Sequence, residues 1–158
     1  MGTTKKELIM QEIMIEFSKT VEMFGLTPLE ARLFSFLYLS EKPLTLDDMS
    51  DALGKSKTSM STNIRSLLEL NLVTRVWKKG VRKDLYEANS QLFKAFMNFY
   101  LKNWIDQANQ QKNSLEEIEK NIKRAKNNEE LTALKEGLKH IIGFHRQLEE
   151  TYKELNQD

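Results

Sequence analysis

Hydrophobic residues recur at steps of three and four through most of the chain, the spacing that places them on one face of an α-helix. Between residues 5 and 24 this stripe consists of Ile9, Ile13, Phe17, Val21 and Phe24. Neighbouring apolar residues widen it, so one packing surface would leave apolar side chains in water. The helix packs either on its own domain alone or also on a partner subunit, and we favour the second interpretation.

A helix followed by a helix-turn-helix is predicted between residues 26 and 70, with the helix-turn-helix itself beginning near Leu44. Thr27, with Pro28 after it, is typical of a helix start, and this helix should end before Pro43. Thr45 is expected to cap a short second helix, and Gly54 supplies the backbone freedom for a tight turn. Ser56 is then expected to cap the next helix, which runs to about residue 70.

The residues that follow predict a β-hairpin. Residues 73–77 and 84–88 are rich in strand-forming side chains, and they enclose a basic, glycine-containing turn at 78–83. A hairpin directly after a helix-turn-helix indicates a winged helix-turn-helix. We therefore expect a mainly α fold with a small β-hairpin wing and long N- and C-terminal dimerisation helices.

The C-terminal residues 90–157 predict a helical hairpin. Ser90 is expected to cap a long helix, and a break at 126–128 separates it from a second one. The second helix carries a heptad seam made of Leu131, Leu134, Leu138, Ile141, His145, Leu148, Tyr152 and Leu155. Two interpretations stay open: the hairpin packs on itself and on a second copy, or only within its own chain. The predicted domains are 1–25 and 90–158 for dimerisation and 26–89 for DNA binding, with the last segment also the candidate ligand region.

Charge is concentrated in one segment. Between Lys55 and Lys83 there are eight Lys or Arg and one acid, Glu69, a net charge of +7 in a chain whose total is +1. Such a concentration is the electrostatic footprint of a phosphate-binding surface. The 158 residues include no cysteine, and their two histidines are a weak basis for a metal site. We find no nucleophile–base pair and no glycine-rich phosphate loop, so an enzyme is not expected.

Small hydroxyl residues and basic residues make up the candidate DNA-binding surface. A helix face exposed only to solvent usually carries long charged side chains, whereas small hydroxyls let the helix approach a groove and bond to it. Arg65 could bond guanine through two hydrogen bonds. The wing tip suits phosphates or the minor groove, although a charge run can be only a solvated face. The candidates are Ser56, Lys57, Thr58, Ser59, Ser61, Thr62, Arg65, Lys78, Lys79, Arg82 and Lys83.

The sequence is similar to MarR-type winged helix-turn-helix repressors, most of all to the glycine-betaine-regulator (GbsR-like) branch. The residues that carry this resemblance are GLTPLEARLFSFLYLSEKPLTLDDMSDALGKSKTSMSTNIRSLLELNLV and VWKKGVRKDLYEA. The resemblance implies a homodimeric repressor of osmoprotectant (choline or glycine betaine) uptake or synthesis genes. It also implies a bacterial protein, with a quaternary ammonium compound such as choline as the candidate effector, although some members of this branch lack an inducer. The residues themselves lead us to expect a cytoplasmic protein without a cofactor, because Glu7, Glu12 and Glu16 interrupt the apolar stretch that an export signal would need.

Aromatic residues near the start of the long helix bear on that effector, because quaternary ammonium groups bind over aromatic faces. An aromatic stripe at helical spacing is, however, more often part of a core. The candidates are Trp77, Phe93, Phe96, Phe99, Tyr100 and Trp104.

The function predicted from the sequence is a homodimeric repressor bound to double-stranded DNA at a pseudo-palindromic operator. A rival of another class is an interaction module whose C-terminal helical hairpin binds a different protein. The segment of net charge +7 favours DNA. No apolar run is long enough to span a membrane, so a membrane is not expected as a partner.

Overall fold

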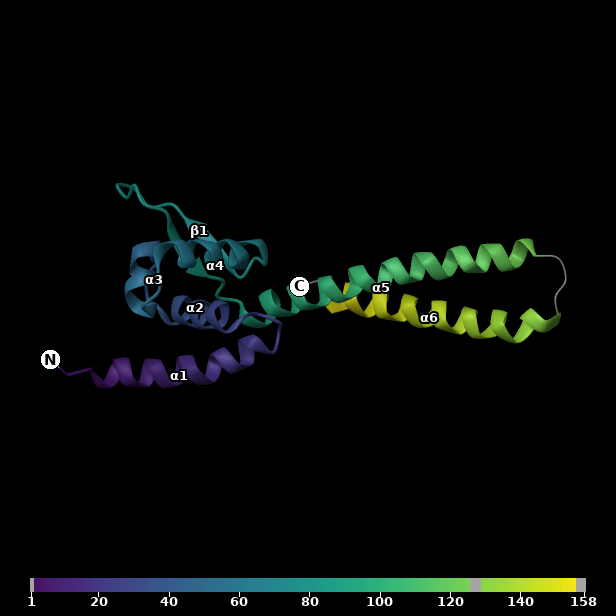
Figure 1. Ribbon diagram of the computed structural model, residues 1–158, viewed down its shortest axis with the longest axis horizontal. Coiled ribbons are helices and arrows are strands. Elements are labelled where there is room, and N and C mark those ends of the chain that lie inside the picture. The colour runs from purple at the N-terminus through teal and green to yellow at the C-terminus, as the bar shows by residue number, and fades with distance from the viewer. Residues whose placement is uncertain (1, 126–128, 156–158) are drawn as a thin grey trace. The chain divides into compact units, whose positions relative to one another are not determined.

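The computed structural model describes residues 2–125 and 129–155 (Figure 1). The predicted helix break at 126–128 lies outside the described residues. Contacts divide the chain into two compact units, residues 1–96 and 97–158. The mainly α fold with a two-stranded hairpin is confirmed. Its elements are α1 (Lys5–Glu22), α2 (Pro28–Leu39), α3 (Leu46–Leu53), α4 (Lys57–Glu69), β1 (Val73–Val76), β2 (Leu85–Ala88), α5 (Leu92–Arg124), the 3₁₀ turn η1 (Glu129–Leu131) and α6 (Thr132–Leu155).

Capping residues set where the helices of the first unit begin. The side chains of Thr27 and Thr45 accept hydrogen bonds from backbone N–H groups in the first turns of α2 and α3. An acid three residues later bonds back to the threonine N–H in both helices. These reciprocal pairs satisfy donors that a helix start leaves open. Ser56 caps α4 by accepting from the Ser59 N–H at 3.1 Å, without a reciprocal acid.

The start of α5 differs from the prediction. Ser90 was expected as its cap, which is wrong, because the helix begins at Leu92. The Gln91 carbonyl accepts the first helical hydrogen bond, from the Ala95 N–H at 3.0 Å. The side chain of Asn89 accepts from the Gln91 N–H instead, also at 3.0 Å. The turn after β2 is therefore closed by an asparagine, whose short amide readily bonds the backbone two residues on.

The wing is the antiparallel hairpin of β1 and β2, in which Val73 pairs with Ala88 and Val76 with Leu85. Each strand is one residue shorter than predicted at the end next to the turn. A bridge that the sequence did not reveal joins Leu44 to Tyr86 through two backbone hydrogen bonds of 2.8 and 2.9 Å. The chain entering α3 is thereby attached to the wing, which holds the wing beside the helix-turn-helix.

The core of the first unit is centred on Phe34 of α2, which is fully buried. Its ring lies 6.2 Å from that of Phe17 on α1 and 5.1 Å from that of Phe96 in α5. The four-residue spacing of Phe34 and Tyr38 predicts that both are buried, but Tyr38 remains 37% exposed, and Leu33 is buried instead. The sequence pattern missed Leu33 because α2 is covered on more than one side.

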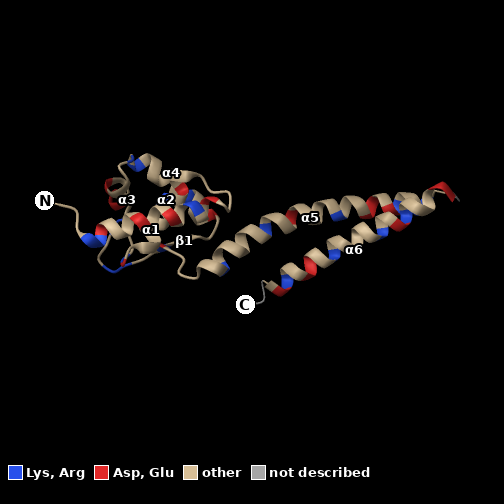
Figure 2. Ribbon diagram, turned by 90° about the horizontal axis from the view of Figure 1, so that it is seen from below, with Lys and Arg blue, Asp and Glu red and all other residues tan. Residues whose placement is uncertain are grey.

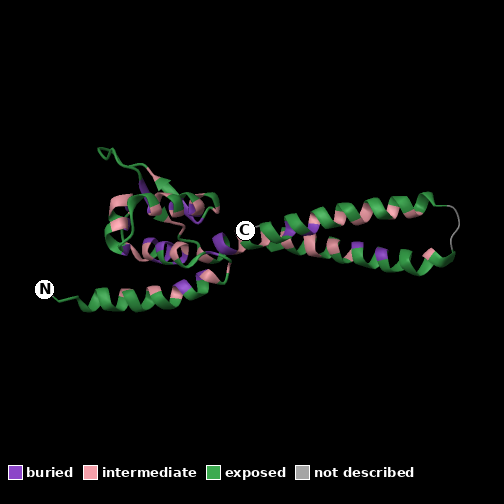
Figure 3. Cartoon of the chain, viewed as in Figure 1, coloured by how far each residue is buried: buried purple, intermediate pink, exposed green. Residues whose placement is uncertain are grey.

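Helix α1 packs on α2 mainly through its C-terminal half (Figure 3). Val21 and Ser18 are buried, and the Ser18 hydroxyl lies 3.2 Å from that of Ser35 on α2. Ile9 and Ile13, in the same predicted stripe, are 45% and 44% exposed. The wide apolar face predicted for this helix is therefore only partly covered within the chain.

The second unit pairs the rest of α5 with α6. Ile105 and Ala108 of α5 and Leu138 and Ile142 of α6 are buried, and a half-buried ion pair of 2.7 Å joins Lys112 to Glu149. The predicted heptad seam is divided between two environments. Leu138 is buried, whereas the seam residues that stay exposed are Leu134, Ile141 and Leu155. Ile142 was not predicted as a seam position because it breaks the heptad spacing.

No helix among the described residues combines the length and the apolar character that crossing a bilayer requires.

Replacing Phe34 by alanine should destabilise the first unit strongly. A phenylalanine truncated in a core leaves a cavity and typically costs about 3–5 kcal/mol of unfolding free energy. Phe93→Ala is the matched control, because Phe93 is 75% exposed and its loss should change stability by about 0.5 kcal/mol or less. Urea unfolding followed by circular dichroism measures both variants. Equal losses would show that Phe34 does not anchor this core.

Candidate nucleic-acid interface

Helix α4 has one face in the core and the opposite face in solvent. Met60, Ile64 and Leu67 are buried, as predicted. Of the side chains proposed for DNA contact, Lys57, Thr58, Thr62 and Arg65 are exposed, as is the capping residue Ser56, and Ser59 and Ser61 are half-buried. The exposed surface of α4 is thus hydroxyl-rich between Lys57 and Arg65, and Glu69 is exposed in its last turn.

Some of these hydroxyl groups already make hydrogen bonds within the helix. The Thr62 hydroxyl donates to the Thr58 carbonyl at 3.1 Å, and the Asn63 amide donates to the Ser59 carbonyl at 2.8 Å. A hydroxyl that donates to its own helix keeps its oxygen lone pairs as acceptors. Thr62 can therefore accept a hydrogen bond from a base amino group, while its donor is in use.

Ser66 corrects the sequence reading. Helical spacing in the sequence predicts that Ser66 lies on the DNA-facing side of α4 near Thr62, but its hydroxyl donates to the carboxylate of Glu30 at the start of α2. Burial raises the pKa of Glu30, while hydrogen bonds from Ser66 and Thr27 outweigh that effect and hold this pKa below its usual value. Ser66 thus orients α4 against α2 and does not face a groove.

The wing tip is an exposed, basic turn. The Val81 N–H donates to the Lys78 carbonyl at 3.1 Å, and Gly80 adopts a left-handed φ of +83° that favours glycine. Lys78, Lys79 and Arg82 are exposed around this turn. Their charges lie on the same compact unit as α4 (Figure 2).

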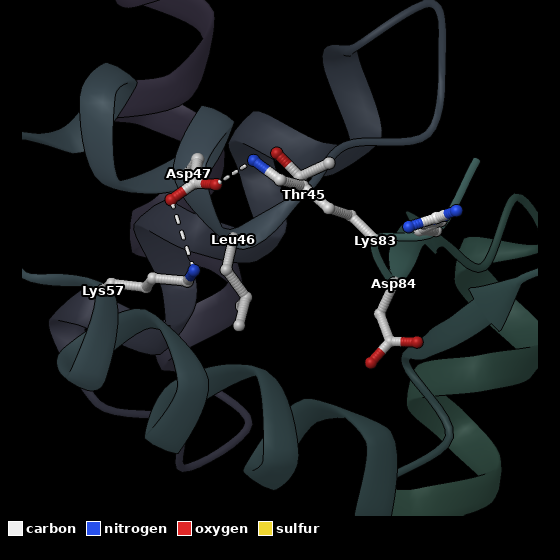
Figure 4. Close-up of a pocket in the computed structure, with 7 residues that line it drawn as sticks. Thr45, Leu46, Asp47, Lys57, Lys83 and Asp84 are labelled. Carbon is white, nitrogen blue, oxygen red and sulfur yellow. Dashed lines mark hydrogen bonds and ion pairs between the residues drawn. The ribbon is translucent and has the colours of Figure 1, made fainter.

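Asp47, in the first turn of α3, bonds two of the proposed DNA-binding lysines. One carboxylate oxygen lies 2.6 Å from the Lys83 ammonium and the other 3.5 Å from the Lys57 ammonium (Figure 4). The hydrogen bond from Lys83 and the charge of Lys57 hold the pKa of Asp47 below its usual value. The same hydrogen bond raises the pKa of Lys83. Sequence reasoning missed Asp47 as a partner of these lysines, because an acid in the first turn of a helix predicts only a favourable interaction with the helix dipole.

These three residues line a pocket of about 260 Å³ between α3, the start of α4 and the wing. Its other lining residues are Thr45, Leu46, Arg82 and Asp84. Between described residues, ion pairs engage Lys57 and Lys83 but not Arg65, Lys78 or Arg82. The interface therefore contains two kinds of cation, those paired with Asp47 and those facing solvent.

Known proteins match this part of the chain. The model of the MarR family matches residues 24–78, which run from the end of α1 through α4 to the first residues of the wing tip. Residues 24–78 are therefore similar to the MarR family.

Curated relatives extend this MarR-family similarity. The HTH-type transcriptional repressor OpcR of Bacillus subtilis (strain 168) is 35% identical over 95 residues, which are 60% of this chain and 51% of that protein. The HTH-type transcriptional repressor GbsR of the same organism is 30% identical over 114 residues, covering 72% of this chain and 63% of the relative. The chain thus spans about half to two thirds of the length of these relatives.

A solved structure supports the fold. The crystal structure of a transcriptional regulator is similar with a TM-score of 0.62 at 17% identity, covering 92% of this chain and 93% of that one. At this identity the likeness shows a shared fold and nothing about a ligand or target.

The aromatic residues predicted to contact a quaternary ammonium ligand lie in different environments. Phe96 is buried in the core of the first unit, with its ring 5.0 Å from that of Phe24. Trp77 and Phe93 are 82% and 75% exposed. In the second unit, Tyr100 and Trp104 are 48% and 42% exposed and Phe99 is half-buried. The ligand site stays a prediction.

Replacing Ser66 by alanine should raise the pKa of Glu30 toward its ordinary value, because burial remains while one stabilising donor is lost. A carboxyl whose pKa is lowered on folding adds stability when ionised, and this stability is lost as the pH falls through the folded pKa. Ser66→Ala should therefore reduce the amount by which the free energy of unfolding rises between acidic and neutral pH. Carboxyl-detected NMR titration measures the pKa, with Ser61→Ala as the control; an unchanged Glu30 pKa would contradict the assignment.

Proposed function

We propose that this protein is a homodimeric, sequence-specific DNA-binding transcriptional repressor. The observation that carries the proposal is the hydroxyl-rich exposed face of α4, on the same compact unit as a wing with cations facing solvent. An α-helix fits the major groove, and small side chains allow its backbone to approach the base edges. The match of residues 24–78 to the MarR family and the two repressors among the relatives support the same function.

In this proposal the two parts of the interface have different tasks. Arg65 and the hydroxyl groups of Thr58 and Thr62 contact bases, while Lys78, Lys79 and Arg82 contact phosphates beside the groove. Base contacts provide sequence preference, and phosphate contacts provide affinity that depends on salt. No catalytic role is assigned to any residue, and the site of action is the cytoplasm, where bacterial DNA lies.

Exposed apolar side chains support the proposed homodimer. Ile9 and Ile13 of α1 and Leu134, Ile141 and Leu155 of α6 are all at least 44% exposed. Apolar surface of this extent on helices usually marks an interaction site. A two-fold dimer would place two α4 helices on one side and require a pseudo-palindromic operator with regularly spaced half-sites.

The proposed target genes are those for uptake or synthesis of choline and glycine betaine. This finer proposal rests on the resemblance to the glycine-betaine-regulator branch and on the similarity to GbsR. A quaternary ammonium effector, with Trp77, Phe93, Phe96, Phe99, Tyr100 and Trp104 as candidate contacts, is part of the same proposal. Such an effector would have to bind two dimer conformations unequally to change repression.

The exposed apolar residues of α6 also favour a second candidate, an interaction module in which the helical hairpin binds a different protein. In vitro selection of fragments from the host genome, with sedimentation analysis of the purified chain, separates the two. Enrichment of a palindrome by a dimer supports the repressor. A monomer that enriches no sequence supports the interaction module.

Arg65→Ala should cost about 1–3 kcal/mol of binding free energy at the selected site and relax the base preference there, because a paired contact to a base edge is lost. Titration of the selected and a scrambled duplex by fluorescence anisotropy measures this difference. Arg32→Ala, an exposed arginine of α2, is the control. Equal weakening on both duplexes would mean that Arg65 contacts phosphate and does not read bases.

Lys79→Ala should weaken binding to all duplexes alike and reduce the slope of log affinity against log salt by about one, the value for one phosphate contact. Lys102→Ala, on α5, provides the control for a general loss of charge. A slope that stays the same in Lys79→Ala would remove this residue from the phosphate contacts.

A further inference from the structure

We infer that Asp47 is a specificity-determining residue, which holds Lys57 and Lys83 away from DNA phosphates until a duplex is seated against both α4 and the wing. This inference rests on the proposed DNA-binding function and adds an acidic residue to an interface otherwise described by its cations. It starts from the geometry of the pocket between α3, α4 and the wing, where the carboxylate of Asp47 contacts both ammonium groups (Figure 4).

The three side chains come from three different elements. Asp47 stands in the first turn of α3, Lys57 is the first residue of α4, and Lys83 closes the wing tip before β2. A single carboxylate therefore connects the start of the proposed recognition helix to the wing. Because the wing is otherwise attached here by the Leu44–Tyr86 bridge, this link also restricts the direction in which its tip points.

The ion pairs are too exposed to be explained by folding stability. The side chain of Asp47 is 42% exposed, and those of Lys57 and Lys83 are 61% and 67% exposed. Exposed ion pairs add little to stability because water and salt screen them. A carboxylate in this position does, however, occupy the place that a phosphate oxygen would take between the same two ammonium groups.

The consequence for DNA binding follows from competition. A phosphate that approaches only one of the two lysines must displace Asp47 and is also repelled by its charge. A duplex seated on α4 and the wing brings phosphates to both lysines together, and these contacts replace both ion pairs. Loose, sequence-independent complexes thus lose two phosphate contacts that the seated complex keeps, which increases discrimination between the two.

The experiment compares Asp47→Asn with Asp51→Asn. Both substitutions remove one negative charge from α3, but Asp51 is exposed and forms no ion pair with a described residue. The probes are a random-sequence 30-base-pair duplex and the duplex that the wild type selects. Asp47→Asn should bind the random duplex about three- to tenfold more tightly than Asp51→Asn at low salt, with a salt slope steeper by about one to two. Its affinity for the selected duplex should change less, so its discrimination falls.

Two further measurements identify the cause. In a background that carries Lys57→Gln and Lys83→Gln, the excess effect of Asp47→Asn should disappear, because the lysines it acts through are gone. In a Trp104→Phe background, Trp77 remains the single tryptophan and stands at the base of the wing tip. Without DNA, its fluorescence anisotropy decay should show larger local motion in Asp47→Asn than in Asp51→Asn.

The outcomes separate this inference from the function on which it rests. A wild type that shows no salt-dependent binding to any duplex overturns both. If the wild type binds and the two aspartate variants behave alike on both duplexes, only the inference is overturned. An excess effect of Asp47→Asn that persists without the two lysines also overturns it, because the carboxylate would then act by general repulsion.

Discussion

Burial of Phe34 is the interaction on which the arrangement of the first unit depends. Its ring lies beside Phe17 from α1 and Phe96 from the start of α5, so these two helices meet at one side chain of α2. A small core holds its helices in a fixed arrangement only when they pack around a common centre, because each helix on its own would be only marginally stable in water. The helix-turn-helix can present α4 to a ligand because α2 behind it is held in this way.

Acidic residues determine how the basic surface is presented. Glu30 receives a hydrogen bond from Ser66 and orients α4, and Asp47 bonds Lys57 and Lys83 at the junction with the wing. Both carboxylates belong to first turns of helices, where a negative charge is favourable near the positive end of the helix dipole. The same position lets them contact groups of a neighbouring element. The positions of the cations on this basic surface thus depend on two acidic residues.

The second unit shows how one helix can supply two surfaces. Leu138 and Ile142 of α6 are buried, while Leu134 and Ile141 of the same helix remain exposed. Residues spaced three and four apart lie in one stripe along a helix, and a residue one position away from that stripe lies at its edge. A heptad pattern in sequence is therefore compatible with both a partner inside the chain and one outside it.

Local chemistry in the sequence determined where the elements begin and what α4 exposes. Thr27, Thr45 and Ser56 cap helices because a hydroxyl bonds the backbone only a few residues away, and the spacing of apolar residues places the hydroxyl-rich face opposite the core. The tertiary structure decided the roles of Ser66 and Asp47. Their partners lie 36 residues away in the chain, at Glu30 and Lys83, and only packing brings such groups within hydrogen-bonding distance.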